Sequence, residues 1–304
     1  MAEKIEIKID GHSFELSNPD KVMFPEDGIT KSDMVEYYQR IAPSMLPYLE
    51  KRAIVMHRFP DGIYGERFYH KEVPEYFPTW IKRITLPKED GVVDYVVADS
   101  AADLAYLAGQ ACITPHSWLS RFDKPNNPDL LIFDLDPSDE VFEIVRQTAL
   151  NLRGILLDLE LSPFIKTTGS RGLHVVCPLD RSTDFDESRK FARDVAELMA
   201  TRDPSNLTIE ARKEKRGSRL LVDYLRNGYG ATAVAPYALR ARRGAPVAVP
   251  ITWEELKDPK LNSQSFNIRN VFRRIGRRKD PWSGMEGKAG SIIRSAKKLE
   301  GLKK

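Results

Sequence analysis

The sequence lacks several features that would place it in other classes of protein. Cysteine is scarce, because only Cys112 and Cys177 occur among 304 residues, and their spacing is not Cys-x-x-Cys. This scarcity argues against a structural zinc and favours a reducing compartment. No apolar run approaches the ~18 residues of a membrane span, and the first residues contain no signal-peptide core. We therefore expect a cytoplasmic protein with no zinc and no membrane partner.

The composition that remains is ordinary, but the charge is unevenly distributed. Hydrophobic residues make up 41% and charged residues 30% of the chain, as in globular proteins. Residues 269–304 contain 12 Lys/Arg and 3 Asp/Glu, so their net charge is +9. The whole chain has a net charge of only +3, so the remaining residues are net acidic. Such a basic segment suggests a polyanionic partner, although a solvated helix or tail would look the same. We expect one domain over residues 1–304, with residues 280–304 as a basic linker and helix.

An apolar stretch at residues 130–133 ends in two acids, Asp134 and Asp136. In an extended strand, side chains two residues apart share a face, so both carboxylates are expected side by side, with Leu135 in the core. Like charges at this separation repel, and a cation between them relieves the repulsion. Carboxylate oxygens suit Mg²⁺ or Mn²⁺ better than zinc. The alternative is a strand end with two solvated acids before Pro137.

A second apolar strand that carries an acid is expected at residues 220–224. If this strand pairs beside the strand of Asp134, Asp223 becomes a third metal ligand. Three carboxylates at the end of two neighbouring strands are the arrangement that two-metal phosphoryl transfer requires.

Residues 168–174 combine two glycines, hydroxyl side chains, Arg171 and His174. Glycine lets the backbone approach a phosphate closely, while hydroxyls and a guanidinium can bond its oxygens. We expect a turn that leads into a strand carrying His174. The stretch is not a Walker motif, because no Gly-Lys-Ser/Thr ends it.

A second candidate anion site precedes an expected helix near the N-terminus. Thr30 and Asp33 form the capping-box pattern of a helix start, which puts Lys31 in the first turn. A cation there is unfavourable unless an anion binds at the helix N-terminus. Asn18 and Lys21, in the preceding loop, would complete such a pocket. The alternative is an exposed lysine without a role.

Three other stretches carry candidate binding residues. Phe68 and Tyr69 lie among cations, and bases stack on aromatic rings while cations hold phosphates. Adjacent aromatics on a strand more often have one ring buried. A loop is expected at residues 114–118, where a lone histidine is usually a bystander. Residues 235–242 are expected to place two arginines on one face of an extended segment, and residues 212–219 form a charged loop.

Four motifs, in this order and at this spacing, resemble the polymerase domain of bacterial DNA ligase D. That domain belongs to the archaeo-eukaryotic primase superfamily and acts in non-homologous end joining. The motifs lie at residues 134–136, 168–174, 220–223 and 236–242. The resemblance begins at Ser17 and covers nearly the whole chain. It implies an α+β fold with a primase-like catalytic core, in which two mixed or antiparallel sheets are flanked by helices.

The resemblance also implies roles for individual residues. Two divalent ions, Mn²⁺ or Mg²⁺, would be held by Asp134, Asp136 and Asp223. The nucleoside triphosphate would be lined by His116, Thr168, Ser170, Arg171, Gly172, His174, Arg240 and Arg242. The 5′-phosphate of a gap or break would be gripped by Asn18, Lys21 and Lys31, and the template would stack on Phe68 and Tyr69. DNA ends would be presented to each other by a mobile loop that contains Arg216 and Arg219.

Two of these positions depart from what is usual in the family. Relatives usually carry Phe where this chain has Tyr69. The hydroxyl that is often Ser is Thr168 here, so its share of the nucleotide contact relative to Ser170 is open.

The implied activity is that of a primase-polymerase. It would add nucleotides, with ribonucleotides preferred over deoxyribonucleotides, to a primer 3′-hydroxyl at gaps or 3′-overhangs by two-metal phosphoryl transfer. The chain has no room for the ligase and nuclease domains of ligase D. The chain is therefore expected to be either a stand-alone polymerase or an excised domain. If it stands alone, a Ku-type protein and a separate DNA ligase would be its partners at the nucleoid.

Two alternatives use the same motifs. A phosphatase with an aspartate nucleophile also places Asp-x-Asp after an apolar strand, but it usually continues with x-Thr, where this chain has Pro137 and Ser138. A non-catalytic DNA-end adaptor would bind through the basic C-terminus. An adaptor has no reason to keep three carboxylates beside the phosphates that they repel, so the acidic triad favours the enzyme.

Overall fold

The computed structural model describes residues 4–88, 90–138 and 141–302. They divide into two compact units, each assembled from three segments of the chain. Unit 1 comprises residues 1–123, 232–248 and 266–278, and unit 2 comprises residues 124–231, 249–265 and 279–304. The sequence showed no dividing linker because the chain passes between the units repeatedly. No helix in the described ranges is long and apolar enough to cross a membrane.

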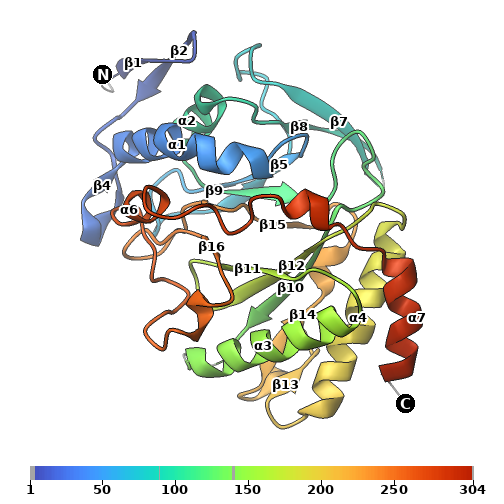
Figure 1. Ribbon diagram of the computed structural model, residues 1–304. Coiled ribbons are helices and arrows are strands. Elements are labelled where there is room, and N and C mark those ends of the chain that lie inside the picture. Colours follow the sequence, from blue (N-terminus) through green and yellow to red (C-terminus); the bar gives the residue numbers. More distant parts are fainter. Residues whose placement is uncertain (1–3, 89, 139–140, 303–304) are drawn as a thin grey trace. The chain divides into compact units, whose positions relative to one another are not determined.

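Unit 1 is organised by a six-stranded antiparallel sheet. Its strands, in spatial order, are β15 (Thr232–Val234), β9 (Cys112–Trp118), β5 (Ile54–Arg58), β8 (Gly91–Val96) and β7 (Arg83–Lys88), and β6 (Phe68–His70) also pairs with β5. Two ribbons precede it in the chain, β1 (Lys4–Ile9) with β2 (His12–Ser17) and β3 (Val22–Phe24) with β4 (Ile29–Thr30). Helix α1 (Lys31–Met45) lies against α2 (Ala101–Gly109), and the short α6 (Val271–Ile275) lies beside α1 (Figure 1).

The local sequence explains most of these elements. The capping box expected at α1 is confirmed, since the Thr30 hydroxyl accepts the Asp33 N–H and the Asp33 carboxylate accepts the Thr30 N–H. The prediction of a loop at residues 114–118 is wrong, because these residues belong to strand β9. Every residue of β9 is buried, so it lacks the alternating pattern of a half-exposed strand, and Pro115 disguises it further.

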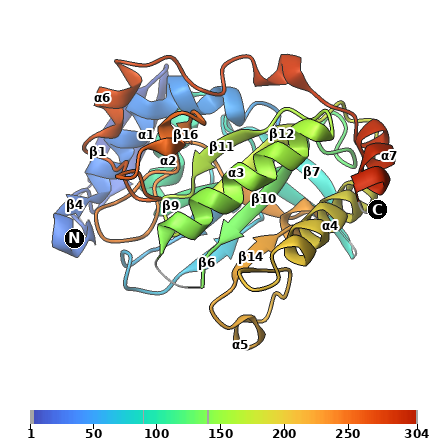
Figure 2. The ribbon, with the colours of Figure 1, turned by 60° about the horizontal axis from the view of Figure 1, so that its bottom comes forward.

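Unit 2 contains a second six-stranded sheet, which is antiparallel except for its edge pair β13–β14. Its strands, in spatial order, are β13 (Leu207–Thr208), β14 (Leu220–Asp223), β10 (Leu130–Asp136), β12 (Leu173–Pro178), β11 (Phe164–Thr167) and β16 (Pro250–Ile251). Helices α3 (Phe142–Asp158) and α4 (Phe185–Arg202) pack on this sheet, and α7 (Ile292–Leu302) packs on α4 (Figure 2). The four-residue α5 (Lys213–Arg216) lies at the tip of a loop before β14.

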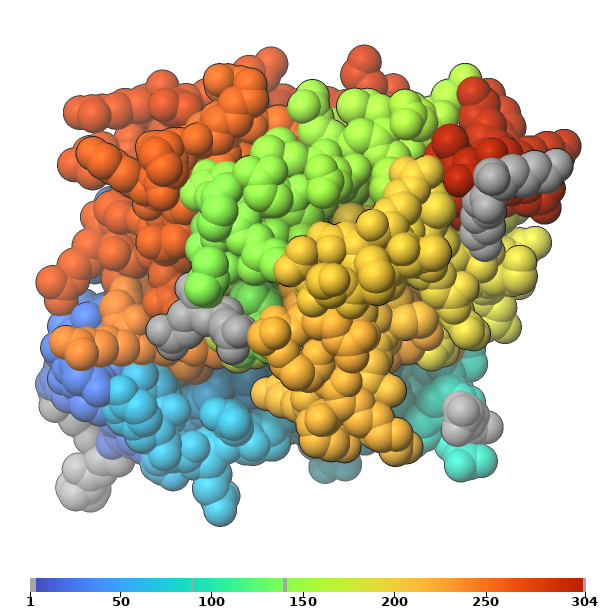
Figure 3. Space-filling view, turned by 90° about the horizontal axis from the view of Figure 1, so that it is seen from below, coloured from blue at the N-terminus to red at the C-terminus, as the bar shows by residue number. Residues whose placement is uncertain are grey.

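The two faces of the second sheet differ in chemistry. Leu173, Leu135 and Val222 are register partners on β12, β10 and β14, and all three are fully buried. The neighbouring positions along each strand therefore project to the opposite face of the sheet. The outer surfaces of α3 (green) and of the segment that leads to β14 (gold to orange) are visible in Figure 3.

Residues 280–290 do not form the expected linker. Gly290 bridges to Leu179 and donates its N–H to the Pro178 carbonyl at 2.9 Å. Trp282 is only 3% exposed, and its indole N–H donates to the Ile165 carbonyl at 2.9 Å. Glycine, proline and serine give this part of the sequence the composition of a linker and conceal the aromatic anchor that fixes it to β11.

We expect Trp282→Ala to destabilise the protein by about 3–5 kcal/mol, because it removes a buried indole and its hydrogen bond. Urea unfolding followed by circular dichroism measures the effect. The exposed Arg294→Ala serves as a control and should change the free energy of unfolding by less than ~0.5 kcal/mol. A loss below ~1 kcal/mol for Trp282→Ala would restore the linker interpretation.

Candidate functional site

The strand register of unit 2 brings two acids face to face. Asp134 on β10 is the direct cross-strand partner of Asp223 on β14, and Asp136 lies two residues further along β10. Cross-strand partners and residues two apart share a face, so all three carboxylates belong to the face opposite Leu135. The pairing of β14 beside β10, on which the third ligand depended, is therefore present.

The same row of side chains continues across two more strands. His174 on β12 is the partner of Asp134 on its other side, and Lys166 on β11 is the partner of His174. His174 Nε2 lies 3.5 Å from Asp134 Oδ1. Burial first, and the charge of Lys166 second, lower the pKa of His174 to about 4, so the imidazole is neutral at physiological pH. Lys166, only 1% exposed, was missed because a single lysine in an apolar strand gives no motif.

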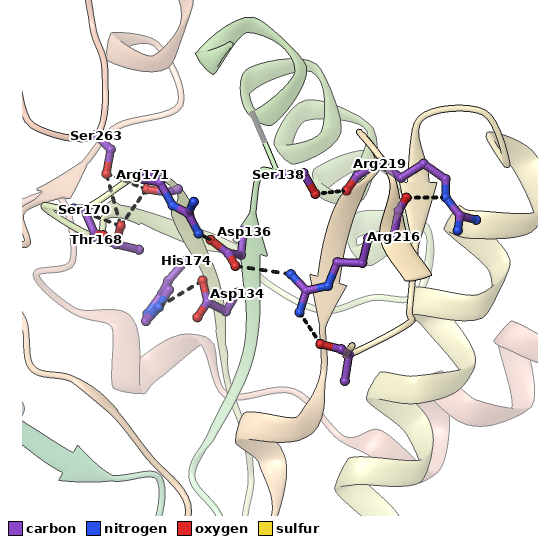
Figure 4. A network of polar contacts seen from close by, with 12 residues as sticks. Asp134, Asp136, Ser138, Thr168, Ser170, Arg171, His174, Arg216, Arg219 and Ser263 are labelled. Carbon is purple, nitrogen blue, oxygen red and sulfur yellow. Dashed lines mark hydrogen bonds and ion pairs between the residues drawn. The ribbon is translucent and has the colours of Figure 1, made fainter. Parts of the chain in front are cut away.

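Arginines neutralise the acids of this row (Figure 4). Arg171 donates to Asp136 Oδ1 at 2.9 Å, and Arg216 approaches Asp136 Oδ2 at 3.4 Å. Arg226 lies 3.4 Å from Asp134 Oδ2 and 3.8 Å from Asp223 Oδ2. Arg226 was not among the predicted site residues, since nothing in the sequence separates it from other surface arginines.

The pKa of Asp223 shows that this carboxylate is partly buried and crowded by a second acid. Burial, followed by repulsion from Asp134, raises the pKa of Asp223 above its usual range. The Leu225 N–H, which donates to Asp223 Oδ1 at 2.7 Å, opposes this shift. Net repulsion between two carboxylates is the condition that a bound cation relieves.

The donor chemistry of this row fits Mg²⁺ or Mn²⁺, which prefer carboxylate oxygens. Within the described ranges, however, no three His, Cys, Asp or Glu side chains converge as a ready cluster of metal ligands. The physical reason is that Asp136 is directed at Arg171 and Arg216 instead. A divalent ion at this place would compete with guanidinium groups for the same oxygens.

The turn at residues 168–172 is held by its own hydroxyl and by a distant segment. The Thr168 hydroxyl accepts the Ser170 N–H, and it contacts the Gly172 carbonyl and the Ser263 hydroxyl at 3.0 and 3.1 Å. Ser263 also donates to Gly172 O, and Gln264 donates to Ser170 O. Thr168 is therefore engaged in shaping the turn, which leaves Ser170 as the better candidate for a ligand contact.

The segment that braces this turn is itself anchored by a buried arginine. Arg146, on α3, donates to the carbonyls of Leu256, Asp258 and Leu261 and is only 5% exposed. The sequence analysis missed these hydrogen bonds, because an arginine that donates to carbonyls more than 100 residues away leaves no local sequence pattern.

The two arginines predicted in the loop at residues 212–219 are both engaged within the protein. Arg216 is 7% exposed and donates to the carbonyls of Glu210 and Ala211 as well as approaching Asp136. Arg219 donates to the carbonyls of Arg216 and Lys215. In this structure Arg216 points inward, toward Asp136. The expected role of the loop in presenting DNA ends to each other stays a prediction. The exposed cations of this loop are Arg212, Lys213 and Lys215.

In unit 1, the structure brings together the three residues of the expected anion pocket. Lys21 N–H donates to Asn18 O, and Lys31 N–H donates to Lys21 O at 2.9 Å. Lys31 is 7% exposed, and burial followed by the charges of Lys21 and Arg58 lowers its pKa. Three cations held this close repel each other, which favours binding of an anion.

The reasoning that led to this pocket needs one correction. The first N–H groups of α1 do not point at a free site, because those of Lys31, Ser32 and Asp33 bond to Lys21 O, Pro19 O and the Thr30 hydroxyl. Any anion attraction must therefore come from the side chains. Lys21 is also paired with Asp61 at 2.6 Å.

Both aromatic rings expected at a nucleic-acid contact are exposed. Phe68 is 43% and Tyr69 is 56% exposed, so neither ring is buried as adjacent aromatics often are. Tyr69 stacks on His57 with centroids 4.2 Å apart, and its edge meets His116 at 5.4 Å. Burial first, then Arg240, lowers the pKa of His57 to about 4, which places Arg240 near this cluster.

Arg58 connects the aromatic residues to the cationic pocket and was missed by the sequence analysis. Its guanidinium lies 5.6 Å from the Phe68 ring centroid and contacts His70 at 3.0 Å and Tyr76 at 3.2 Å. Its charge also contributes to the lowered pKa of Lys31.

The predicted nucleotide-binding residues are divided between the units. Unit 1 contains His116, Arg240 and Arg242, and unit 2 contains Thr168, Ser170, Arg171, Gly172 and His174. Within unit 1, Arg240 and Arg242 lie on a tight turn in which Arg240 N–H donates to Pro246 O and Arg242 N–H donates to Arg240 O.

Gly172 gives a direct test of the turn beside the acids. A Cβ at this position would lie 1.8 Å from Leu135 O, the carbonyl between the two acids of β10. We expect Gly172→Ala to lower the free energy of unfolding by about 1–3 kcal/mol, because backbone must shift. The control is Gly154→Ala on α3, where nothing lies within 4 Å and stability should rise by about 0.5–1 kcal/mol. Thermal unfolding measures both, and equal stability of the two variants would contradict this packing.

Comparison with known proteins gives the chain a family. The model of the LigD primase-polymerase domain matches residues 30–282. The multifunctional end-joining repair protein LigD of Mycobacterium tuberculosis H37Rv is 35% identical over 271 residues, which are 86% of this chain and 35% of that protein. LigD of Pseudomonas aeruginosa PAO1 is 31% identical over 276 residues, 90% of this chain and 33% of that protein. The chain thus spans about a third of these relatives.

A solved structure agrees with the sequence matches. The polymerase domain of Mycobacterium tuberculosis ligase D, solved in complex with DNA, superposes with a TM-score of 0.85 at 33% identity. The match covers 90% of this chain and 98% of that one, and it confirms the expected α+β fold. With its family match extending over residues 30–282, this chain belongs to the LigD primase-polymerase domain family.

Proposed function

We propose that this chain is a nucleotidyltransferase that extends a primer 3′-hydroxyl at gaps or breaks in DNA during end joining. The observation that carries the proposal is the register of β10 and β14, which sets Asp223 opposite Asp134, with Asp136 two residues away. Carboxylates from two adjacent strands are suited to bind the cations of phosphoryl transfer. Membership of the LigD family supports the same conclusion.

The proposed cation ligands are Asp134, Asp136 and Asp223. Bound divalent cations, Mn²⁺ or Mg²⁺, would supply Lewis acidity at the primer oxygen and neutralise charge on the leaving pyrophosphate. Arg171 and Arg216, which now contact Asp136, would then be free to bind the negative charge of the triphosphate. His174, being neutral, orients Asp134 without adding a competing charge.

The turn beside the acids is proposed to hold the nucleotide phosphates. Ser170 and Arg171 belong to it, and Gly172 keeps it against the backbone of β10. His116, Arg240 and Arg242 are also proposed as nucleotide-binding residues, on the strength of the family motif. Preference for ribonucleotides remains a prediction, which competition between ribo- and deoxyribonucleoside triphosphates would test.

The DNA-binding elements are proposed to lie in unit 1. Asn18, Lys21 and Lys31 would grip the 5′-phosphate of the downstream strand, and Phe68 and Tyr69 would stack on the template bases. The exposure of both rings supports this role, because stacking needs a free aromatic face. A Ku-type protein and a DNA ligase remain predicted partners. The adaptor and phosphatase alternatives leave the third carboxylate, Asp223, without a role.

We expect Asp134→Asn to abolish nucleotide addition while DNA binding persists, because the side chain keeps its size but loses its charge. Loss of one cation ligand removes several kcal/mol of transition-state stabilisation, a decrease of roughly a thousandfold or more in rate. Primer extension on a gapped duplex with Mn²⁺ measures this. The control Asp186→Asn alters an exposed acid on α4 and should extend normally. Wild-type extension by Asp134→Asn would rule out the proposed role.

We expect Lys31→Met to weaken binding to a gapped duplex only when the downstream strand carries a 5′-phosphate. A charge-assisted contact contributes about 1.5–3 kcal/mol, so the affinity should fall by roughly ten- to a hundredfold. Fluorescence anisotropy with 5′-phosphorylated and 5′-hydroxyl duplexes gives the comparison.

Two checks make the lysine experiment decisive. Lys288→Met removes an exposed cation from unit 2 and should leave the phosphate preference intact. Because Lys31 Nζ also donates to Ser17 O at 2.8 Å, thermal unfolding must show that the variant is folded. An equal loss of affinity for both duplexes would remove the pocket assignment.

A further inference from the structure

Unit 1 contains a row of exposed arginines outside every site described above. Arg269, Arg273 and Arg277 are all exposed and are spaced four residues apart around helix α6. Helical turns continue on both sides of α6, since Val271 N–H donates to Asn267 O and Arg278 N–H donates to Arg274 O. Residues four apart lie on one face of a helix, so these three side chains form a single row, which we name the arginine ridge.

The opposite face of the helix fixes the ridge in place. Val271 is fully buried, and the Phe272 ring packs against Tyr37 of α1 with centroids 5.6 Å apart. The Arg40 guanidinium also lies over the Phe272 ring, 4.2 Å from its centroid. Figures 1 and 2 both show α6 beside α1. The ridge is therefore presented on a supported element rather than on a loose tail.

The charges of the ridge are not neutralised by nearby acids. Within the described part of the chain, neither Arg273 nor Arg277 has a carboxylate partner within 4.0 Å. Arg274, by contrast, is half-buried over the Phe266 ring at 4.7 Å and does not belong to the ridge. Exposed cations without partners suit a polyanion, because binding releases the counterions condensed on that polyanion.

Three acids lie on the groove between α1 and α6, a cavity of about 240 Å³, but each is engaged elsewhere. Asp27 accepts the Gly244 N–H, Asp33 caps α1, and Glu36 pairs with Arg40 at 3.1 Å. Their repulsion of a phosphate backbone is therefore reduced.

The position of the ridge indicates which part of a DNA substrate it fits. Arg269 donates to the carbonyl of Asp27 at 2.7 Å, and Asp27 precedes the start of α1 at Lys31 by four residues. The ridge thus begins next to the element that carries the proposed 5′-phosphate pocket. Between Arg269 and Arg277 it spans about 12 Å at a helical rise, a length comparable to two or three consecutive phosphates of one strand.

We propose that the arginine ridge binds the sugar–phosphate backbone of the duplex downstream of the 5′-phosphate. This inference rests on the proposed function, because it takes gapped DNA as the ligand. It is separate from the C-terminal helix α7, to which the sequence analysis attributed part of the basic charge. The ridge would add affinity without base specificity and would leave the chemical step unchanged.

The test compares two gapped, 5′-phosphorylated duplexes whose downstream arms differ by one helical turn, about 4 and about 14 bp. The ridge variant carries Arg269→Gln, Arg273→Gln and Arg277→Gln. The charge-matched control carries Lys288→Gln, Arg294→Gln and Lys297→Gln, three exposed cations of unit 2. Thermal unfolding verifies that both variants are folded, and fluorescence anisotropy at several salt concentrations gives affinities and salt slopes.

The expected result is that the wild type and the control bind the long arm more tightly than the short arm, while the ridge variant loses that gain. Three lost phosphate contacts should lower the affinity for the long arm by roughly 10- to 100-fold and reduce the salt slope by about 2–3. A wild-type gain in the ridge variant, or an equal loss in the control, would overturn the proposal.

Primer extension at saturating DNA separates this inference from the function on which it rests. The ridge variant should extend at the wild-type rate, because none of its residues belongs to the proposed catalytic row. If the wild type itself does not extend primers, the proposed polymerase activity fails, while the binding comparison still decides whether the ridge contacts DNA. A slower extension rate at saturating DNA in the ridge variant alone would contradict a purely binding role.

Discussion

The antiparallel pairing of β10 with β14 is the constraint on which unit 2 depends. It sets Asp134 against Asp223 in register, although two carboxylates on adjacent strands repel each other. The register cannot shift, because on the opposite face of the sheet Leu135 packs with Leu173 and Val222 beneath the helices. A slip of one residue would turn the acids toward that buried face. Hydrophobic packing on one face thus enforces electrostatic crowding on the other.

The surrounding residues show how that crowding is tolerated. Arg226 spans Asp134 and Asp223, and Arg171 and Arg216 hold Asp136. Guanidinium groups satisfy carboxylate lone pairs but do so from flexible side chains, so a divalent ion of higher charge density can displace them. Under the proposed function, the arginines would neutralise the acids when no divalent ion is bound, and the ions would do so when they bind. No carboxylate would then be left without a partner in this partly buried place.

Much of this arrangement was predictable from local sequence, and the rest was not. Strand alternation alone placed Asp134 and Asp136 on one face, and the apolar run before Asp223 indicated a second strand. The choice of register partners, the arginines and the brace from Ser263 depend on contacts between distant residues, which leave no periodic signal. Strand β9 was mistaken for a loop, because a strand buried on both faces has no alternating pattern. The segment around Trp282 was mistaken for a linker, because its one aromatic anchor lies among glycine, proline and serine.

The two units separate residues whose charges would otherwise conflict. Unit 2 contributes the acids, and the arginines that neutralise them also come from unit 2. Unit 1 contributes Lys21, Lys31 and Arg58. Burial first, and the charges of Lys21 and Arg58 second, lower the pKa of Lys31, and a bound anion would relieve both effects. Under the proposed function, a polyanion would bind to the cations of unit 1, and divalent ions would bind to the acids of unit 2. A small overall charge of +3 is compatible with that proposal, because local concentrations of charge, rather than the net charge, would attract each ligand.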